Sequence, residues 1–287
     1  MANNGGVLAL TLTACSTSAG PKPHLSSLEP DSSLRPATSL QPTTSLAPST
    51  VDNFFGGGLQ RQDFGSFGLD RTENVPSDDG RFATALRVRY PADSASQLSA
   101  ANSDTSDGGA QVYLARWGGP VDEAYLRYYV RFPADFDFVR GGKLPGLYGG
   151  RTNNGRKIPD GTNGFSTRYM WRAKGAGEVY AYLPSSVAHG TSLGRGSWSW
   201  PTGAWTTVEQ HVRLNTPGQA DGQVQVWLNG ALVFEQTGLT FRSTWTLRIE
   251  GLFFSTFFGG GDAPGPRRVT STPTSPGSSY PRRRVSP

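Results

Sequence analysis

The amino-acid sequence predicts an all-β protein, a single domain of two packed antiparallel sheets of the β-sandwich or jelly-roll type. Short segments in which apolar and polar residues alternate predict strands that each bury one face. Turn signals rich in Gly, Pro, Asn and Asp separate these segments about every ten residues, a spacing typical of sandwiches and barrels. The chain also contains 7 Trp, 10 Tyr and 15 Phe among its 287 residues, enough aromatic surface for one sizeable core.

Two extensions of different composition flank the predicted domain at residues 51–262. Residues 16–50 are rich in Ser, Thr and Pro and show no strand or helix period, so we expect a disordered linker. Residues 263–287 contain five Arg and no acidic residue, and we expect a disordered basic tail. The abrupt change of composition after Gly261 suggests a shifted reading frame or a divergent end. Since the formal net charge of the whole chain is +5, the remainder is close to neutral.

Residues 1–15 resemble a truncated lipoprotein signal. Residues 7–15 form a short apolar run that ends in Leu-Thr-Ala-Cys, and Cys15 is the only cysteine. One expectation is therefore lipidation of Cys15, with the protein outside the cell, at the cell surface or in the periplasm. The first six residues lack the Lys or Arg of an export signal, so a chance cysteine in an unstructured terminus is the alternative. No apolar run approaches the ~20 residues of a transmembrane helix, so membrane contact is expected only through that lipid.

Strand patterns begin in the domain at residues 81–90, where Leu86, Val88 and Tyr90 share one face. Residues 92–109 are rich in Ser, Asp and Gly and are expected to form a long loop.

The next strand pattern, at residues 123–132, has an aromatic and cationic face. In a jelly roll, Arg and Tyr side chains in this arrangement can line a sugar cleft. They also cover the solvated outer surface of many sheets, so a cleft and a solvated surface both remain open. The residues of this face that we take as candidates for substrate binding are Arg127, Tyr129 and Arg131.

The second half of the domain continues the same alternation. Asn229-Gly230 marks a two-residue hairpin turn. The glycine-rich segment Gly-Gly-Lys-Leu-Pro-Gly-Leu at residues 141–147 is expected to be a loop. Strands are expected at residues 165–171, 178–183, 205–214, 223–228 and 231–234.

Two of these strands and the glycine-rich segment place a candidate site. Because alternate side chains of a strand share a face, Ser166 and Arg168 lie together, and so do Tyr180 and Tyr182. If the two strands are neighbours, the segment that carries Lys143 can reach the same patch. A patch of cations and hydroxyls suits an anionic sugar.

Four motifs in order resemble polysaccharide lyase family 14, which includes alginate lyases with a jelly-roll fold. They are Gly-Gly-Lys-Leu-Pro-Gly-Leu, Phe-Ser-x-Arg-x-Met-Trp, Tyr-x-Tyr, and Phe-Phe-Ser-Thr-Phe-Phe-Gly-Gly at residues 253–260. The resemblance spans about residues 125–260. It implies a lyase that cleaves a uronic-acid polysaccharide of the alginate or glucuronan type. The resemblance also implies that the functional residues of this family correspond here to Lys143, Ser166, Arg168, Tyr180 and Tyr182.

These residue types match the needs of β-elimination. Lys143 and Arg168 can neutralise the substrate carboxylate and stabilise the anionic intermediate. Tyr180 or Tyr182 can move the protons if nearby cations lower the pKa of a tyrosine. Ser166 orients substrate by hydrogen bonding. His189 is a further candidate for binding, and the scheme requires neither a metal nor an organic cofactor.

Other functions have weaker support in the sequence. A non-catalytic carbohydrate-binding jelly roll at the cell surface is the main alternative. A glycosidase needs two paired carboxyl groups, and nothing pairs Glu178 with Glu209. The three His residues are scattered and predict no zinc site. Since the domain is near neutral, we do not expect it to bind a nucleic acid. The expected partner is an anionic polysaccharide, and the protein is expected to be a monomer.

Overall fold

The computed structural model describes residues 5–9, 50–55, 58–76, 82–91, 94–95, 106–116 and 118–259. The expectations for Cys15, for the linker before residue 50 and for the basic tail at residues 263–287 concern parts of the chain outside these ranges. No helix in the described part is both long enough and apolar enough to cross a membrane.

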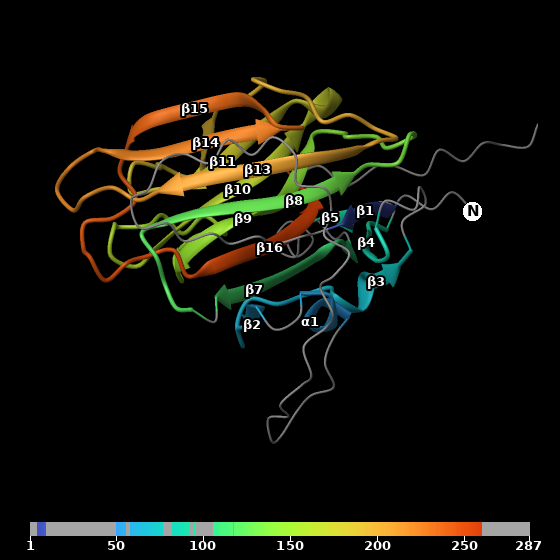
Figure 1. The fold of residues 1–287 in the computed structure, drawn as a ribbon, viewed down its shortest axis with the longest axis horizontal. Coiled ribbons are helices and arrows are strands. Elements are labelled where there is room, and N and C mark those ends of the chain that lie inside the picture. The colour runs from blue at the N-terminus through green and yellow to red at the C-terminus, as the bar shows by residue number, and fades with distance from the viewer. Residues whose placement is uncertain are drawn as a thin grey trace, which may run out of the picture.

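Two seven-stranded sheets stacked face to face form the domain, which confirms the predicted sandwich (Figure 1). Sheet A has the spatial order β15-β14-β13-β8-β1-β4-β3, and sheet B the order β12-β11-β10-β9-β16-β7-β2. The strands of sheet A are β1 (Gly5–Ala9), β3 (Thr72–Val75), β4 (Ala85–Arg89), β8 (Glu123–Arg131), β13 (Trp205–Arg213), β14 (Gly222–Leu228) and β15 (Ala231–Leu239). The strands of sheet B are β2 (Leu59–Arg61), β7 (Ala110–Arg116), β9 (Gly141–Gly150), β10 (Gly164–Arg172), β11 (Gly177–Tyr182), β12 (Thr191–Leu193) and β16 (Gly251–Phe258).

Few other regular elements occur in the described ranges. Strands β5 (Ser94–Ala95) and β6 (Ser106–Asp107) form a small parallel pair within the segment expected to be a long loop. The described residues contain one short α-helix, α1 (Thr50–Phe55), and 3-10 turns at Leu69–Arg71 and Ala173–Gly175.

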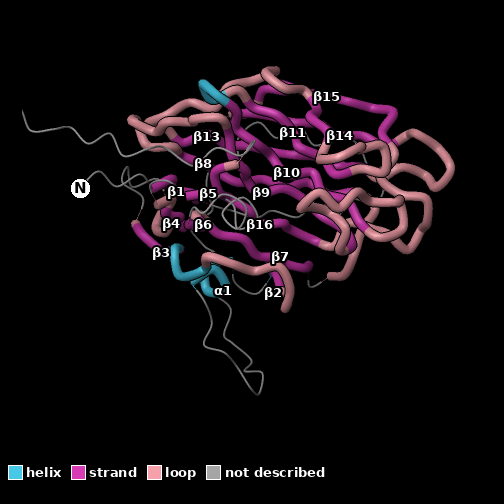
Figure 2. Tube along the Cα trace, turned by 180° about the vertical axis from the view of Figure 1, so that it is seen from behind, coloured by secondary structure: helices cyan, strands magenta, loops and turns pink. Residues whose placement is uncertain are grey.

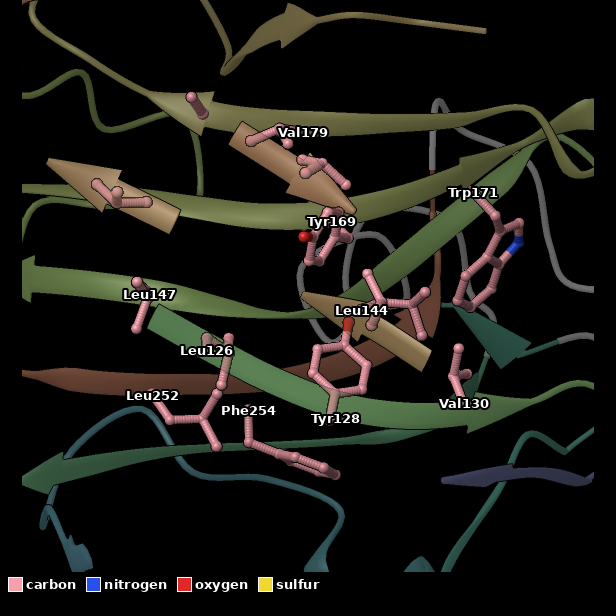
Figure 3. Close-up of a cluster of buried hydrophobic side chains, with 14 of the residues drawn as sticks. Leu126, Tyr128, Val130, Leu144, Leu147, Tyr169, Trp171, Val179, Leu252 and Phe254 are labelled. Carbon is pink, nitrogen blue, oxygen red and sulfur yellow. The ribbon is translucent and has the colours of Figure 1, made fainter. Parts of the chain in front are cut away.

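The core lies between the two sheets and takes side chains from both (Figure 3). Aromatic rings fill one part of it: Phe136 stacks on Phe258 with ring centroids 5.6 Å apart, and Phe132 meets Trp171 edge-on at 5.4 Å. The predicted aromatic core is therefore confirmed. The labelled core residues of Figure 3 are Leu126, Tyr128, Val130, Leu144, Leu147, Tyr169, Trp171, Val179, Leu252 and Phe254.

Buried polar side chains join the two sheets across this core. Thr167 Oγ1 donates a 2.7 Å hydrogen bond to Gln210 Oε1, and Gln210 Nε2 donates a 2.8 Å bond to the Thr167 carbonyl. The Tyr169 hydroxyl donates a 3.1 Å bond to the carbonyl of Glu209. Because these residues of β10 point into the core, their immediate neighbours on the same strand point away from it.

Residues 141–147 belong to strand β9 and do not form the loop expected from their glycines and proline. β9 lies in the middle of sheet B, between β10 and β16. A Cβ atom at Gly142 would meet the Trp171 ring at 2.0 Å, and one at Gly146 would meet the Thr167 carbonyl oxygen at 2.2 Å. The glycines therefore allow neighbouring groups to approach the strand closely, which is a second common reason for glycine besides a turn.

Pro145 occupies a β-bulge in this strand. β10 pairs Arg168 with Gly146 and the next residue, Tyr169, with Leu144, so Pro145 is the extra residue on β9. Proline has no N–H group for the ladder, and sheets tolerate it at bulges. The proline that favoured a loop in the sequence is thus accommodated inside a strand.

The bulge also resets which side chains of β9 face outward. Leu144 and Leu147 are buried in the core between the sheets, whereas Lys143 and Tyr148 contact residues of the outer face. In a regular strand, Lys143 and Tyr148 would point to opposite faces, because their sequence separation is odd. The extra residue brings both polar groups to the same side of sheet B.

The other predicted strands are confirmed with small differences in their ends. β8, β10, β11, β13 and β14 begin and end within about one residue of the expected ranges. β4 is shorter than the expected 81–90, and β15 extends beyond residue 234 to Leu239. Asn229 and Gly230 both have positive φ, 49° and 83°, as a type I′ hairpin requires.

Strand β1 lies inside sheet A, between β4 and β8. Val7 pairs with Arg87 on one side and with Arg131 on the other. This position differs from the expectation that residues 1–15 stand outside the folded domain, since a short apolar run suits a buried strand as well as a signal. A chain cleaved before Cys15 lacks β1 and leaves the facing edges of β4 and β8 unpaired.

Deleting residues 1–10 is expected to lower the midpoint of thermal unfolding, because backbone groups of β4 and β8 lose their hydrogen-bond partners. Calorimetry of the full and shortened chains measures the shift. Deletion of residues 276–287 is the control and is expected to leave the midpoint unchanged. An equal midpoint for the full chain and the chain without residues 1–10 contradicts the pairing and favours a removable signal.

Candidate active site

The outer face of sheet B gathers polar and aromatic side chains from neighbouring strands. In the view from behind, β7, β16, β9, β10 and β11 follow one another across this sheet (Figure 2). The strand register brings together the functional set expected from the sequence. It places Tyr182 opposite Ser166, Tyr180 opposite Arg168, and Lys143 opposite Met170.

Lys143 lies on this face with its amine among apolar and aromatic atoms. Its side chain is 8% exposed. The Nζ atom contacts the sulfur of Met170 and lies 3.5 Å from the centroid of the Tyr180 ring. Within the described part of the chain, Lys143 forms no ion pair. A thioether and an aromatic face are weak partners for an ammonium group compared with the water that it loses.

The pKa of Lys143 lies well below its ordinary value, chiefly because burial removes water from the charged form. The positive charges of Arg168 and Arg172 lower this pKa further, and the carboxylate of Glu178 opposes them. Glu178 is itself buried and accepts hydrogen bonds of 2.9 and 2.6 Å from Arg172. The amine is therefore suited to accept a proton, which differs from the fixed cation expected from the sequence.

Arg168 is the buried cation of the site. Its side chain is 2% exposed, and its Nη1 donates a 3.1 Å hydrogen bond to Ser255 Oγ. Its Cζ atom lies 4.3 Å from the centroid of the Phe253 ring. The Nε group has no hydrogen-bond partner among the described residues. An unsatisfied buried charged donor is costly, and a carboxylate oxygen is the kind of acceptor that would satisfy it best.

Tyr180 and Tyr182 form a pair whose ring centroids are 5.8 Å apart at an interplanar angle of 78°. The segment after β11 packs directly on both rings at Gly190. A Cβ atom at this position would lie 2.6 Å from Tyr180 Cε1 and 2.9 Å from Tyr182 Cε2. Gly190 therefore helps to position both tyrosines, a role that its sequence neighbourhood does not signal.

The pKa of Tyr180 is raised, first by burial and then by Tyr182. Arg172 and Arg168 act in the opposite direction and do not reverse this shift. The expectation that nearby cations turn a tyrosine into a phenolate is therefore wrong for Tyr180. Its hydroxyl remains protonated at neutral pH and is suited to donate a proton.

Ser166 holds the segment that follows β9. Its buried hydroxyl donates a 2.7 Å hydrogen bond to the carbonyl of Asn153, so it does not point freely toward a substrate. Tyr113 of β7 donates a 2.8 Å bond to Asn153 Oδ1 and stacks on Phe253 at 4.0 Å. Tyr113 and Asn153 were not among the residues predicted from the sequence. Alternation in residues 110–116 could have identified a strand, but not that it lies beside β16.

The structure corrects the assignment of Arg127, Tyr129 and Arg131 to the sugar cleft. All three belong to β8 of sheet A, whose intervening residues fill the core, so they lie on the opposite outer face of the sandwich. Arg127 forms an ion pair with Glu209 across that face, at 2.5 Å. Of the two interpretations left open by the sequence, the solvated outer face is the correct one.

His189 lies exposed in the loop between β11 and β12, next to Gly190. Within the described residues, no hydrogen bond or ring contact joins it to Lys143, Arg168 or the tyrosine pair. Its role in binding stays a prediction. No group of three or more His, Cys, Asp and Glu in the described part lies close enough together to hold a metal ion.

Comparison with known proteins gives consistent matches. A family model described as Polysaccharide lyase 14 matches residues 78–265. Among solved structures, the PL-14 alginate lyase from Aplysia kurodai is 31% identical with a TM-score of 0.62, over 71% of this chain and 85% of that one. Alginate lyase Aly36B is 25% identical with a TM-score of 0.57, over 71% of this chain and 80% of its own.

Two viral proteins also match. Alginate lyase vAL-1 from Chlorella virus is 23% identical with a TM-score of 0.59, over 69% of this chain and 84% of its own, a likeness that shows the fold alone. Exolysin from Paramecium bursaria Chlorella virus 1 is 26% identical over 186 residues, 53% of this chain and 28% of that protein. The chain therefore spans less than a third of this curated relative.

The substitution Lys143→Met is expected to raise the thermal unfolding midpoint at neutral pH, because Met fills similar space without a charge to desolvate. Since the pKa of Lys143 is lower in the folded than in the unfolded chain, the unfolded chain binds more protons between the two values. Between these two pKa values, the parent's free energy of unfolding should therefore rise with pH. The difference in free energy of unfolding between the variant and the parent should become smaller over the same pH range. Thermal melts of both proteins across neutral and alkaline pH measure this difference.

Lys174 provides the matched control, since its side chain is exposed. Lys174→Met should leave the midpoint nearly unchanged at every pH. A Lys143→Met variant that is less stable than the parent at neutral pH contradicts the account of a buried amine whose pKa is lowered by desolvation.

Proposed function

The chain belongs to the polysaccharide lyase 14 family, and from this premise we propose that it cleaves a polyuronate, such as alginate or glucuronan, by β-elimination. The observation that carries the proposal is the buried contact of Lys143 with Tyr180, on the same face as Arg168, whose Nε group has no hydrogen-bond partner among the described residues. A proton acceptor, a proton donor and a carboxylate-binding cation thus lie on one face. The family match and the named alginate lyases among the similar structures support the substrate class.

The geometry suggests a distinct task for each group. Arg168 pairs with the carboxylate of the uronate and stabilises the charge that develops when the neighbouring C5 proton is removed. The neutral amine of Lys143 takes this proton, and the electron pair left on C5 forms a double bond to C4. The bond from C4 to the glycosidic oxygen breaks, and the Tyr180 hydroxyl gives its proton to the departing oxygen.

This assignment revises the division expected from the sequence, in which a tyrosine was the base and Lys143 a fixed cation. The revision follows from the opposite pKa shifts of the two groups, since burial lowers the pKa of an amine and raises that of a phenol. Groups whose environments push their pKa values in opposite directions are candidates for the acid and base of one reaction. Tyr182 and Gly190 position Tyr180 in this scheme.

A location outside the cell or at its surface is part of the proposal, because polyuronates are polymers of walls and matrices. Lipidation at Cys15 is compatible with that location. It requires removal of the residues before Cys15, including β1, so the lipid-anchored chain and the chain with an intact sheet A are alternative forms.

Incubation of the purified protein with alginate and with glucuronan is expected to raise near-ultraviolet absorbance as the unsaturated product forms. Lys143→Ala and Tyr180→Phe should each lower turnover by a factor of about 100 to 1,000, as expected when a group acting in the transition state is removed. For the parent, kcat/KM should rise with pH as the amine of Lys143 loses its proton.

Lys174→Ala is the control and should retain the parent's turnover. Retention on the polymers without any product, even after long incubation, supports the alternative of a non-catalytic carbohydrate-binding module. If both variants stay within about threefold of the parent while the parent is active, the catalytic groups lie elsewhere.

A further inference from the structure

The segment that joins β9 to β10 carries three cations at the edge of the candidate active site. Residues 151–157 read Arg-Thr-Asn-Asn-Gly-Arg-Lys and contain no acidic residue; we call them the cationic loop. The side chains of Arg151, Arg156 and Lys157 are exposed. None of the three forms an ion pair with any residue that the structure describes.

Two acidic residues, Asp160 on the segment between β9 and β10 and Glu250 just before β16, accept hydrogen bonds from backbone N–H groups. Asp160 accepts a 2.7 Å hydrogen bond from the backbone N–H of Thr162. Glu250 accepts a 3.0 Å bond from the backbone N–H of Gly150. Within the described residues, neither carboxylate forms an ion pair with a cation of the loop, so these cations can meet an anion from solution.

Hydrogen bonds attach the cationic loop to residues on the outer face of sheet B. Asn153 is fully buried, its carbonyl accepts the 2.7 Å bond from Ser166, and its side chain bonds to Tyr113 and, at 3.0 Å, to the Gly150 carbonyl. Asn154 contacts the Tyr113 hydroxyl as well. Two asparagines thus hold the loop in place while its cations remain exposed.

Arg156 adopts a backbone conformation that is unfavourable for arginine. Its φ angle is 69°, in the left-handed region that glycine and asparagine prefer. In this conformation its backbone N–H faces the Tyr182 hydroxyl at 3.4 Å. Such strain persists where the surroundings impose it, commonly at sites that bind ligands. The backbone of Arg156 is therefore held beside the tyrosine pair.

Arg151 is linked to the buried Arg168 by a continuous stack of rings. Its guanidinium lies 4.1 Å from the centroid of the Phe64 ring, which lies 4.7 Å from that of Tyr113. Tyr113 stacks on Phe253 at 4.0 Å, and Phe253 lies 4.3 Å from the Arg168 guanidinium. An exposed cation and a buried cation thus lie at the two ends of one row of aromatic rings.

We propose that the cationic loop is a carboxylate-binding rim that holds uronate units of the polymer outside the cleavage position. This inference rests on the proposed function, since it needs a substrate with a carboxylate on every sugar. A polyuronate that places one carboxylate on Arg168 carries further carboxylates along its length, and the exposed Arg151 and Arg156 lie where they can meet them. The rim favours longer chains over short ones and contributes mainly to binding, because it does not touch the reacting atoms.

The test compares the parent with Arg151→Gln, Arg156→Gln and the double variant. With alginate polymer, KM should rise about two- to fivefold for each single change, the range expected for exposed charge pairs, and kcat should change less than KM. Raising the salt concentration should increase the parent's KM more steeply than that of the double variant. Binding measured in a Lys143→Ala background should weaken more for an alginate octasaccharide than for a trisaccharide.

Arg213→Gln removes an exposed cation from sheet A and is the matched control; it should match the parent in all these measurements. Arg151→Glu reverses a charge of the rim and should raise KM more than Arg151→Gln does. Suppose that the parent cleaves alginate, but the rim variants bind the octasaccharide with the affinity of the parent or of Arg213→Gln. The proposed rim is then refuted, and the proposed function stands. If the parent neither cleaves nor binds any polyuronate, both fail together.

Discussion

The β-bulge at Pro145 is the constraint on which the arrangement of the site depends. Without the extra residue, strand β9 could not place Leu144 and Leu147 in the core while turning both Lys143 and Tyr148 to the outer face. Strand β10 pairs with β9 on both sides of the bulge. Its residue Thr167 points into the core and is hydrogen-bonded to Gln210 of sheet A, which holds β10 in place. Packing between the sheets therefore determines where the amine of Lys143 lies, and the close approach of neighbouring groups explains why the strand is rich in glycine.

Burial of Lys143 links this packing to chemistry. An amine on a solvated loop keeps its proton at neutral pH, whereas an amine held against Met170 and the Tyr180 ring loses water and has a lowered pKa. The same desolvation raises the pKa of Tyr180, so one environment prepares a proton acceptor and a proton donor side by side. Arg168 stays cationic in this setting, because a guanidinium keeps its proton over the accessible pH range. Removing water from the amine of Lys143 and the hydroxyl of Tyr180 lowers the free energy of unfolding of the protein.

Most of the strands and the shared face of the main site residues could be predicted from the sequence. The signal was the alternation of apolar and polar side chains. The period of two identified β8, β10, β11 and β13 and the shared face of Ser166, Arg168 and the tyrosines, because alternation depends only on the local backbone. Strand neighbours depend on the whole fold, so the sequence could not show that Arg127 and Arg131 belong to the opposite sheet. The glycines and Pro145 suggested a loop, since sequence does not distinguish a turn from a crowded central strand with a bulge. The direction of the pKa shifts required the burial of each group, which only the packed structure provides.

The central claim, that burial lowers the pKa of the Lys143 amine well below its ordinary value, can be measured directly. Nuclear magnetic resonance of protein labelled at lysine side chains, with the Lys143 signal assigned by its absence in a Lys143 variant, follows the titration of this single amine. The account predicts a midpoint well below the ordinary lysine value of about 10.4. A Lys143 midpoint at or above that ordinary value would contradict the account and return the role of base to a tyrosine.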